Sequence, residues 1–384
     1  MLVATRRFVG ATTTATTHAR RALRCTVVPA SASGAPASSS RNRDMLGPRR
    51  GAYSRGHSPP RPKRSLGQNF LLDSSLARGV VQVSGVTPGN RVLEVGPGRG
   101  ALTTHLLEMG ALVLAVEKDD IYAAELGATA PPALRVVHED VLAWKPLVSG
   151  DAAALLAEFP CAFNDACARA DDASLLESSC IDAQSHNERD ERELGDEEDS
   201  RASVLGNIPY NITTPLLEVL LPRSDAFREV VLMLQREAAM RLVSLEPGGK
   251  DYRAFSTFVD YHCEKAEIIA EVGREAFTPK PRVDSCVVRF TLRAHDERRF
   301  AHLGRKLERK FHRFVSLAFT NRRKMVRNNL ASSYGGANAV VDAMCRAGID
   351  SDARPQNLDV DAFASIYEAL VSSAANQSEN VPSS

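Results

Sequence analysis

A short β-branched segment that runs into a glycine-rich turn constrains the fold of this chain more than any other feature. The segment covers Arg91–Val95, the turn reads Gly96-Pro97-Gly98-Arg99-Gly100, and helical spacing follows over Ala101–Glu108. Glycines let a backbone turn tightly and approach a ligand without an intervening Cβ, and a helix N-terminus offers free N–H groups. The G-x-G-x-G spacing lacks the third glycine of the dinucleotide fingerprint, which favours a ligand without a pyrophosphate. A tight turn that binds no ligand is the alternative.

The pattern beyond this turn predicts an α/β fold. Apolar segments with strand character cover residues 112–116, 134–137, 204–206, 229–234 and 287–292, and helical spacing covers residues 214–221. Short apolar strands separated by helices are typical of a parallel sheet covered on both faces. We therefore expect a Rossmann-like sheet with the glycine-rich turn at the end of its first strand.

Two acids follow the second and third predicted strands. Glu117 ends the apolar run 112–116, and Asp140 follows the run 134–137. An acid at the end of the second strand can accept hydrogen bonds from ribose hydroxyls, and one at the third can accept from an adenine amine. Each acid alone is more often a solvated residue at a strand end. Together with the glycine-rich turn they predict a pocket for an adenosine-containing ligand.

A four-residue turn, Asn207-Ile208-Pro209-Tyr210, follows the fourth predicted strand. The exocyclic amine of adenine is a poor nucleophile because its lone pair is delocalised into the ring. Acceptors such as the Asn207 side-chain oxygen and the Ile208 carbonyl can localise that lone pair, and Tyr210 can stack on the base. Catalysis would then depend mainly on positioning. The alternative is an ordinary proline turn.

The charge distribution is uneven although the net charge of the 384 residues is only +1. Residues 1–64 hold 13 Lys/Arg and one acid, and the other 320 residues hold 35 Lys/Arg and 46 Asp/Glu. A basic, Ser- and Ala-rich segment without an apolar core predicts an organelle transit peptide over residues 1–62, with the plastid as the expected organelle and the mitochondrion as the alternative. A basic arm that binds RNA is the alternative.

Two later regions differ from the α/β pattern. Residues 177–199 contain ten acids and two arginines, so we expect a disordered insert over about residues 148–201. Residues 293–327 contain 12 Lys/Arg and three acids, and their apolar residues follow helical spacing from Leu307 to Phe319. With a short helix over Phe363–Val371, they predict a helical domain over residues 293–372 that binds RNA, followed by a disordered tail over 373–384.

The composition excludes several other classes of site. Seven cysteines form no C-x-x-C pair, so no metal site is expected. No apolar run approaches the length of about 18 residues that a membrane span needs. A nicotinamide oxidoreductase is disfavoured by the glycine spacing.

Four segments together resemble the KsgA-type ribosomal RNA adenine dimethyltransferases. They are residues 65–73 (SLGQNFLLD), residues 94–100, residues 207–210 and residues 277–285 (FTPKPRVDS). The resemblance covers about residues 63–292 well and the C-terminal helices more loosely. It implies a class I S-adenosylmethionine-dependent methyltransferase domain over residues 63–292.

The resemblance also implies the activity and the residues of the site. The activity would be N6,N6-dimethylation of two adjacent adenines in small-subunit ribosomal RNA, by a monomer that acts on the immature small ribosomal subunit and not at a membrane. The family's methyl-donor contacts fall on Asn69, Leu71, Gly96, Glu117, Asp140 and Asn207, and its target-base residues on Asn207, Tyr210 and Phe277. Phe277 would form the second side of a stacking sandwich around the flipped-out adenine.

Two other functions remain open within this fold. A resistance-type methylase of large-subunit RNA is disfavoured by the leader and by the loop that begins at Phe277. A non-catalytic ribosome-assembly or transcription factor would be expected to have lost the donor residues or the 207–210 turn, and both are intact.

Overall fold

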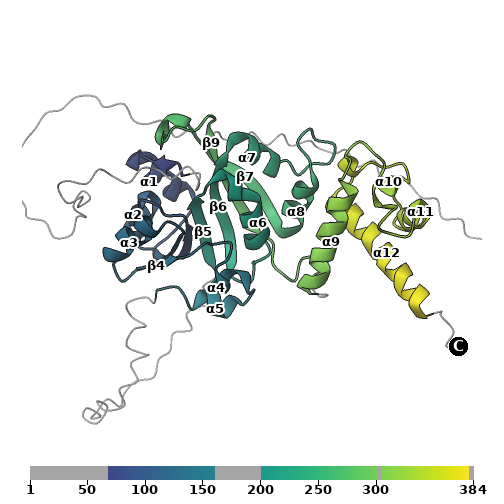
Figure 1. Cartoon of the computed structure of the whole chain (residues 1–384), viewed down its shortest axis with the longest axis horizontal. Coiled ribbons are helices and arrows are strands. Elements are labelled where there is room, and N and C mark those ends of the chain that lie inside the picture. Colours follow the sequence, from purple (N-terminus) through teal and green to yellow (C-terminus); the bar gives the residue numbers. More distant parts are fainter. Residues whose placement is uncertain (1–67, 161–199, 301–303, 380–384) are drawn as a thin grey trace, which may run out of the picture.

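The computed structural model describes residues 68–160, 200–300 and 304–379, with side chains described up to residue 372. The expected leader and the most acidic part of the expected insert lie outside these ranges. In the described part, a seven-stranded sheet has the strand order β4-β3-β2-β5-β6-β9-β7 (Figure 1). Its strands are β2 (Arg91–Val95), β3 (Leu112–Glu117), β4 (Leu134–His138), β5 (Ala202–Asn207), β6 (Phe227–Gln235), β7 (Cys263–Val272) and β9 (Ser285–Leu292).

The sheet is mixed, whereas the sequence predicted a parallel one. Strands β4, β3, β2, β5 and β6 are parallel, but β9 is antiparallel to both β6 and β7. The chain passes from β7 to β9 through residues 273–284 without a crossover helix of normal length, and such a connection joins antiparallel strands. The sequence did not reveal β7, because this edge strand, CEKAEIIAEV, carries four charged residues among its ten.

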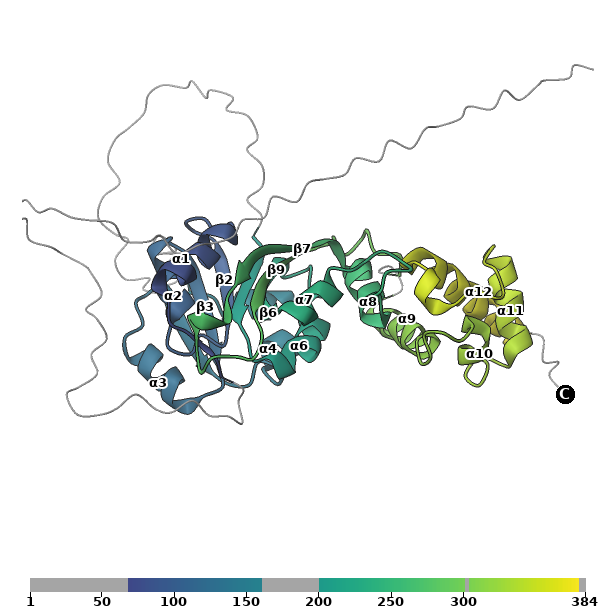
Figure 2. The same ribbon diagram turned by 90° about the horizontal axis from the view of Figure 1, so that it is seen from above.

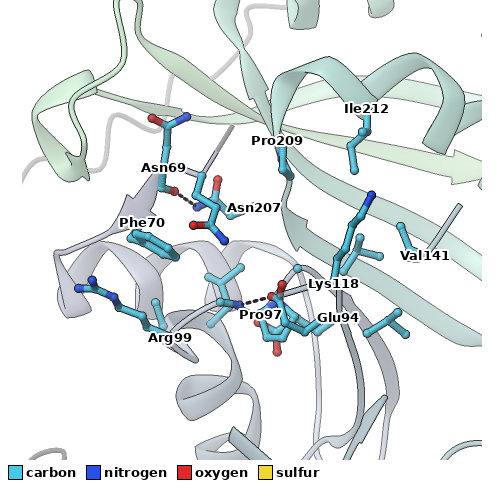
Figure 3. Close-up of a pocket in the computed structure, with 18 of the residues that line it drawn as sticks. Asn69, Phe70, Glu94, Pro97, Arg99, Lys118, Val141, Asn207, Pro209 and Ile212 are labelled. Atoms are coloured by element: carbon cyan, nitrogen blue, oxygen red, sulfur yellow. Dashed lines mark hydrogen bonds between the residues drawn. The ribbon is translucent and has the colours of Figure 1, made fainter. Parts of the chain in front are cut away.

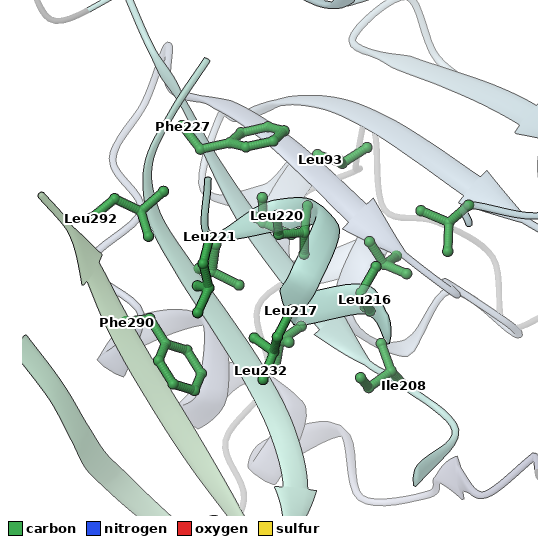
Figure 4. Packing of buried hydrophobic residues seen from close by; sticks show 14 of the residues in the cluster. Leu93, Ile208, Leu216, Leu217, Leu220, Leu221, Phe227, Leu232, Phe290 and Leu292 are labelled. Atoms are coloured by element: carbon green, nitrogen blue, oxygen red, sulfur yellow. The ribbon is translucent and has the colours of Figure 1, made fainter. Parts of the chain in front are cut away.

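Helices cover both faces of the sheet because successive strand residues point to opposite sides. Val92 of β2 belongs to a cluster with α1 (Ser74–Val83) and α2 (Ala101–Glu108). Its neighbours Leu93 and Val95 belong to the other cluster, with α6 (Thr213–Leu220), α7 (Arg236–Leu242) and α8 (Ala254–His262). Figure 4 shows Leu217 and Leu220 of α6 packed against the sheet. A further helix, α3 (Asp120–Ala128), packs against β3 and β4.

Part of the expected insert is ordered. The structure has α4 (Lys145–Val148) and α5 (Ala152–Leu156), where the sequence predicted disorder from about residue 148. Leu155 and Phe159 are buried in the cluster that contains α6, which offsets the ordering entropy of this segment. The expected disorder is therefore wrong for residues 148–159, and the expected insert from residue 161 to 199 lies outside the described residues.

The C-terminal helices form a separate hydrophobic cluster at the end of the molecule away from α3 (Figure 2). They are α9 (Arg305–Ala318), α10 (Val326–Leu330), α11 (Ala337–Arg346) and α12 (Val360–Glu379). The predicted amphipathic pattern is confirmed in α9, where Phe311, Phe314 and Val315 are buried. The last helix was predicted too short, and it includes much of the expected tail. No proline or glycine interrupts the sequence between residues 360 and 379, so nothing ends the helix earlier.

A buried arginine joins the C-terminal helices to the sheet domain. Arg298 is 2% exposed and lies in the connection between β9 and α9. Its guanidinium donates to the Pro222 carbonyl at 3.3 Å, to Ser224 Oγ at 3.3 Å and to His262 Nδ1 at 2.9 Å. It also pairs with the buried Glu308 of α9, with 3.6 Å between Nη1 and Oε1. One side chain thus contacts both parts of the protein.

We predict that Arg298→Met lowers the free energy of unfolding by about 3–5 kcal/mol, because Glu308 is left as a buried charge without its partner. The neighbouring Arg299 provides a matched control, since its ion pair with Glu368 is partly exposed. Arg299→Met should change the free energy of unfolding by at most about 1 kcal/mol. Urea unfolding at pH 7 measures both values, and equal effects would contradict the role given to Arg298.

Candidate active site

The register of three parallel strands places the ends of those strands side by side. Val95 of β2 lies opposite Val116 of β3 and Gly206 of β5. The next residue on each strand is therefore at the same edge of the sheet, and these residues are Gly96, Glu117 and Asn207. Strand β2 lies between β3 and β5, so the chain continues on one side of β2 first and on its other side later. Ligands bind at such a switch point in α/β sheets.

A cavity of about 170 Å³ lies at this edge (Figure 3). Every residue predicted to contact the methyl donor lines it, namely Asn69, Leu71, Gly96, Glu117, Asp140 and Asn207. These residues come from segments separated by as many as 138 positions, as in the pair Asn69 and Asn207. The structure therefore brings together in one place the residues that the sequence could only assign separately.

The glycine-rich turn forms one wall of the cavity and leaves room for a ligand. Gly96, Gly98 and Gly100 all have positive φ angles, of 66°, 54° and 76°. A Cβ at Gly96 would meet no atom within 4 Å, so the backbone there borders open space. A Cβ at Gly98 would lie 3.1 Å from the Phe70 ring. The turn thus needs glycine for its conformation and, at Gly98, also for the close approach of Phe70.

Glu117 and Asp140 already have partners in the ligand-free site. Glu117 accepts from the Gly98 amide at 2.9 Å and from the Asp119 amide at 2.7 Å, which holds the carboxylate against the glycine-rich turn. Burial raises the pKa of Glu117, and these backbone bonds oppose that rise. Asp140 accepts from Lys118 Nζ at 2.7 Å, and this bond lowers the pKa of Asp140. Both carboxylates are therefore fixed in position before a ligand binds.

A second buried carboxylate, which was not predicted as a site residue, lines the cavity. Glu94 is 1% exposed, and its Oε2 atom has no hydrogen-bond partner among the described residues. Burial raises the pKa of Glu94 to about 7, hydrogen bonding from Thr103 opposes this rise, and the negative charge of Glu117 adds to it. The signal in the sequence was an acid inside the apolar strand Arg91–Val95. A buried oxygen without a partner beside a cavity indicates a site for a cationic or hydrogen-bond-donating group.

A short N-terminal strand covers the cavity. Strand β1 (Phe70–Leu71) pairs with β8 (Phe277–Thr278) in a separate two-stranded sheet. The Phe70 ring contacts Tyr122 edge-on, with 5.2 Å between ring centroids, and the Arg99 guanidinium lies 4.7 Å from its centroid. These contacts hold the segment over the glycine-rich turn, as Figure 3 shows for Phe70, Arg99 and Pro97.

The Asn207 side chain has a defined orientation. Its Nδ2 atom donates to the Asn69 carbonyl at 3.0 Å, across the cavity from the end of β5 (Figure 3). Because the amide nitrogen is held in this bond, the oxygen Oδ1 is the end of the amide that remains for a ligand. The side chain of Ile208 is buried in the core, and Pro209 continues the cavity wall.

The two predicted stacking residues do not line the cavity. The Phe277 ring is 3% exposed and belongs to the core cluster that includes Leu71. The ring is enclosed beside the β1–β8 pair rather than open to the cavity, and its stacking on a base stays a prediction. Tyr210 is partly buried on the turn that continues from Pro209, and its hydroxyl lies 2.9 Å from Ser285 Oγ. Tyr210 thus follows Pro209, which lines the cavity, whereas Phe277 lies in the core.

Other classes of site find no counterpart in the described ranges. No group of three or more His, Cys, Asp or Glu residues that could hold a metal ion occurs in the part of the chain that the structure covers. Nor does any helix of residues 68–160, 200–300 or 304–379 have the length and apolar character needed to cross a membrane.

Comparison with known proteins identifies the family. The ribosomal RNA adenine dimethylase family matches residues 61–372. Ribosomal RNA small subunit methyltransferase A of Moorella thermoacetica is 34% identical over 313 residues, covering 80% of this chain and 92% of the relative. The chloroplastic ribosomal RNA small subunit methyltransferase of Arabidopsis thaliana is 31% identical over 313 residues, covering 80% of this chain and 79% of the relative.

A solved structure shares the fold. A dimethyladenosine transferase from Plasmodium falciparum superposes with a TM-score of 0.55 at 18% sequence identity, and the match covers 79% of this chain and 98% of the other. The expected class I methyltransferase fold, with its appended helices, is thereby confirmed. Since the family match spans most of the sequence, including the glycine-rich turn, the 207–210 turn and the 277–285 loop, the chain belongs to the ribosomal RNA adenine dimethylase family.

Proposed function

We propose that this protein transfers methyl groups from S-adenosylmethionine to the N6 atoms of two adjacent adenines in small-subunit ribosomal RNA of a plastid. The observation that carries the proposal is the meeting of Gly96, Glu117 and Asn207 at one edge of the sheet, around a single cavity. The relatives named as small-subunit ribosomal RNA methyltransferases, one of them chloroplastic, support the substrate and the compartment.

The cavity fits the methyl donor of the family. The open space at Gly96 admits the donor against the backbone, and the unpartnered Glu94 oxygen suits its ammonium group. Glu117 keeps lone pairs for the ribose hydroxyls, and Asp140 lies where it can accept from the adenine amine of the donor. When bound, S-adenosylmethionine supplies a methyl group on a sulfonium, which is a very good leaving group.

Asn207 holds the acceptor amine in this proposal. Its Oδ1 atom, oriented by the bond from Nδ2 to the Asn69 carbonyl, accepts one N–H of the target N6. The Ile208 carbonyl accepts the other, so that the lone pair of the nitrogen is localised and directed at the methyl carbon. Tyr210 stacks on the base. The methyl–sulfur bond breaks to leave a neutral thioether, and the methylated, cationic nitrogen then loses its proton readily to water. No strong base is required, and the rate depends on positioning in a site that the protein has arranged beforehand.

The C-terminal helices hold the RNA in this proposal. On α9 the side chains of Lys306, Arg309, Lys310 and Arg313 are exposed, opposite the buried Phe311 and Phe314. Such a basic face contacts phosphates and positions a substrate without reading its sequence. We propose that the protein acts as a monomer on the immature small ribosomal subunit, where unstacked adenines are accessible.

A non-catalytic assembly factor is the second candidate function. It would need neither a cavity lined by the donor residues nor an oriented Asn207. Because all of these features occur together, catalysis accounts for more of the site than a purely structural role does.

We predict that Asn207→Ala lowers the rate of methyl transfer by about 100-fold or more, because an acceptor directed at the reacting amine is removed. Transfer from labelled S-adenosylmethionine to immature small subunits measures the rate. Gln82→Ala removes an exposed amide from α1 and serves as the control with full activity. Full activity of Asn207→Ala, or transfer by the wild type to large-subunit RNA only, would contradict the proposal.

We predict that Glu94→Gln stabilises the ligand-free protein at pH 8 while weakening donor binding. Because the pKa of Glu94 is raised in the folded protein, its contribution to the free energy of unfolding is fully present below pH 4.5. This contribution is lost as the pH rises through about 7, where the buried carboxyl group ionises. The loss amounts to about 3 kcal/mol, and the neutral glutamine avoids it. Thermal unfolding at pH 5 and pH 8 measures the change, and calorimetry measures donor binding.

The exposed Glu125 on α3 provides the matched substitution for this experiment. Glu125→Gln should alter neither the stability nor the binding of S-adenosylmethionine. A stability difference between Glu94→Gln and the wild type that is the same at both pH values would show that ionisation of Glu94 is not its cause.

We predict that residues 1–64 direct a fused fluorescent protein into plastids, because this basic segment has the composition of a transit peptide. Microscopy with plastid and mitochondrial markers provides the measurement. Replacing its arginines by glutamine should leave the fusion in the cytosol. Import into mitochondria alone would overturn the plastid assignment but not the proposed activity.

A further inference from the structure

The turn that carries Tyr210 makes a side-chain hydrogen bond to a distant part of the chain. Tyr210 begins a one-turn 3-10 helix, η3 (Tyr210–Ile212), and none of the residues in this turn is fully buried. A short turn of this kind does not fix an aromatic ring by packing alone. The hydroxyl of Tyr210 lies 2.9 Å from Ser285 Oγ, 75 residues further along the chain.

Ser285 is held much more firmly than the turn it contacts. It is the first residue of β9, is 0% exposed, and pairs with Gln235 of β6 on one side and Val272 of β7 on the other. The backbone of Ser285 is therefore fixed within three strands of the central sheet. A side chain that extends from such a position can serve as a rigid support for a partner on a less constrained element.

We propose that Ser285 is a positioning residue for methyl transfer, because its hydroxyl fixes the Tyr210 ring at the angle needed to stack on the target adenine. The inference rests on the proposed function and gives a task to the last residue of the 277–285 segment. It also explains how two segments that are distant in the sequence act together, since the bond ties the 207–210 turn to the end of the 277–285 loop.

The chemistry of the pair suits positioning rather than proton transfer. Burial raises the pKa of Tyr210, so the phenol remains protonated at neutral pH. One hydroxyl donates and the other accepts, and removal of either group leaves its partner without the bond. Because neither Tyr210 nor Ser285 lines the donor cavity, the loss should leave the affinity for S-adenosylmethionine unchanged.

The test is a double-mutant cycle with Ser285→Ala, Tyr210→Phe and the double variant, assayed on immature small subunits. A single bond of this kind predicts that kcat falls about five- to tenfold in each single variant. The double variant should fall no further, because both substitutions remove the same bond. The Kd for S-adenosylmethionine should equal that of the wild type, and Ser285→Thr, which keeps a hydroxyl, should restore kcat.

Ser203→Ala is the matched control, because Ser203 is also a buried strand serine with one side-chain hydrogen bond, to Glu229, but lies at the other end of β5. It should leave kcat unchanged. The inference would be overturned if Ser285→Ala kept the wild-type kcat or if the two effects added in the double variant. It would also be overturned if Ser285→Thr lost as much kcat as Ser285→Ala. Tyr210→Phe tests the same bond without altering the core, should Ser285→Ala fold poorly. Inactivity of the wild type would instead contradict the proposed function.

Discussion

The parallel register of β3, β2 and β5 is the constraint on which the site depends. Hydrogen bonds between these strands align Val116, Val95 and Gly206, and the next residue in each case is the last of its strand or the first beyond it. The strand pairing alone thus brings Glu117, the glycine-rich turn and Asn207 to one cavity. No contact between their side chains is needed for this. A shift of one strand by a single residue would turn its side chains to the other face and separate the donor residues from Asn207.

This dependence explains which parts of the site could be predicted from the sequence. Glu117, Asp140 and Asn207 were found because each follows an apolar strand, and the ends of parallel strands meet. The antiparallel β7 was not predicted because its charged residues obscure the apolar pattern of a strand. The connection from β7 to β9, which contains Phe277, was therefore not recognised either. The burial of Phe277 and the bond between Tyr210 and Ser285 depend on tertiary packing, which no local pattern in the sequence records.

Buried charges in this protein have two different uses. Both terminal nitrogens of Arg298 have partners, and these partners lie on the helical domain and on the sheet domain. Glu94, in contrast, keeps an oxygen without a partner beside the cavity, and its raised pKa reflects that unfavourable position. The first arrangement favours the folded state, whereas the second becomes favourable only when a ligand supplies the missing donor.

Strand β1, the first element that the structure describes, follows a residue that takes part in the site. The Asn69 carbonyl orients Asn207, and this carbonyl lies only a few residues beyond the expected leader. A processing protease that cuts before Gln68 leaves the orienting carbonyl in place, whereas one that cuts within β1 removes it. The main sheet does not include β1, so an overtrimmed chain retains the strands that form its core. For a chain whose leader is removed, the position of the cut would then decide whether the Asn207 side chain keeps its orienting partner.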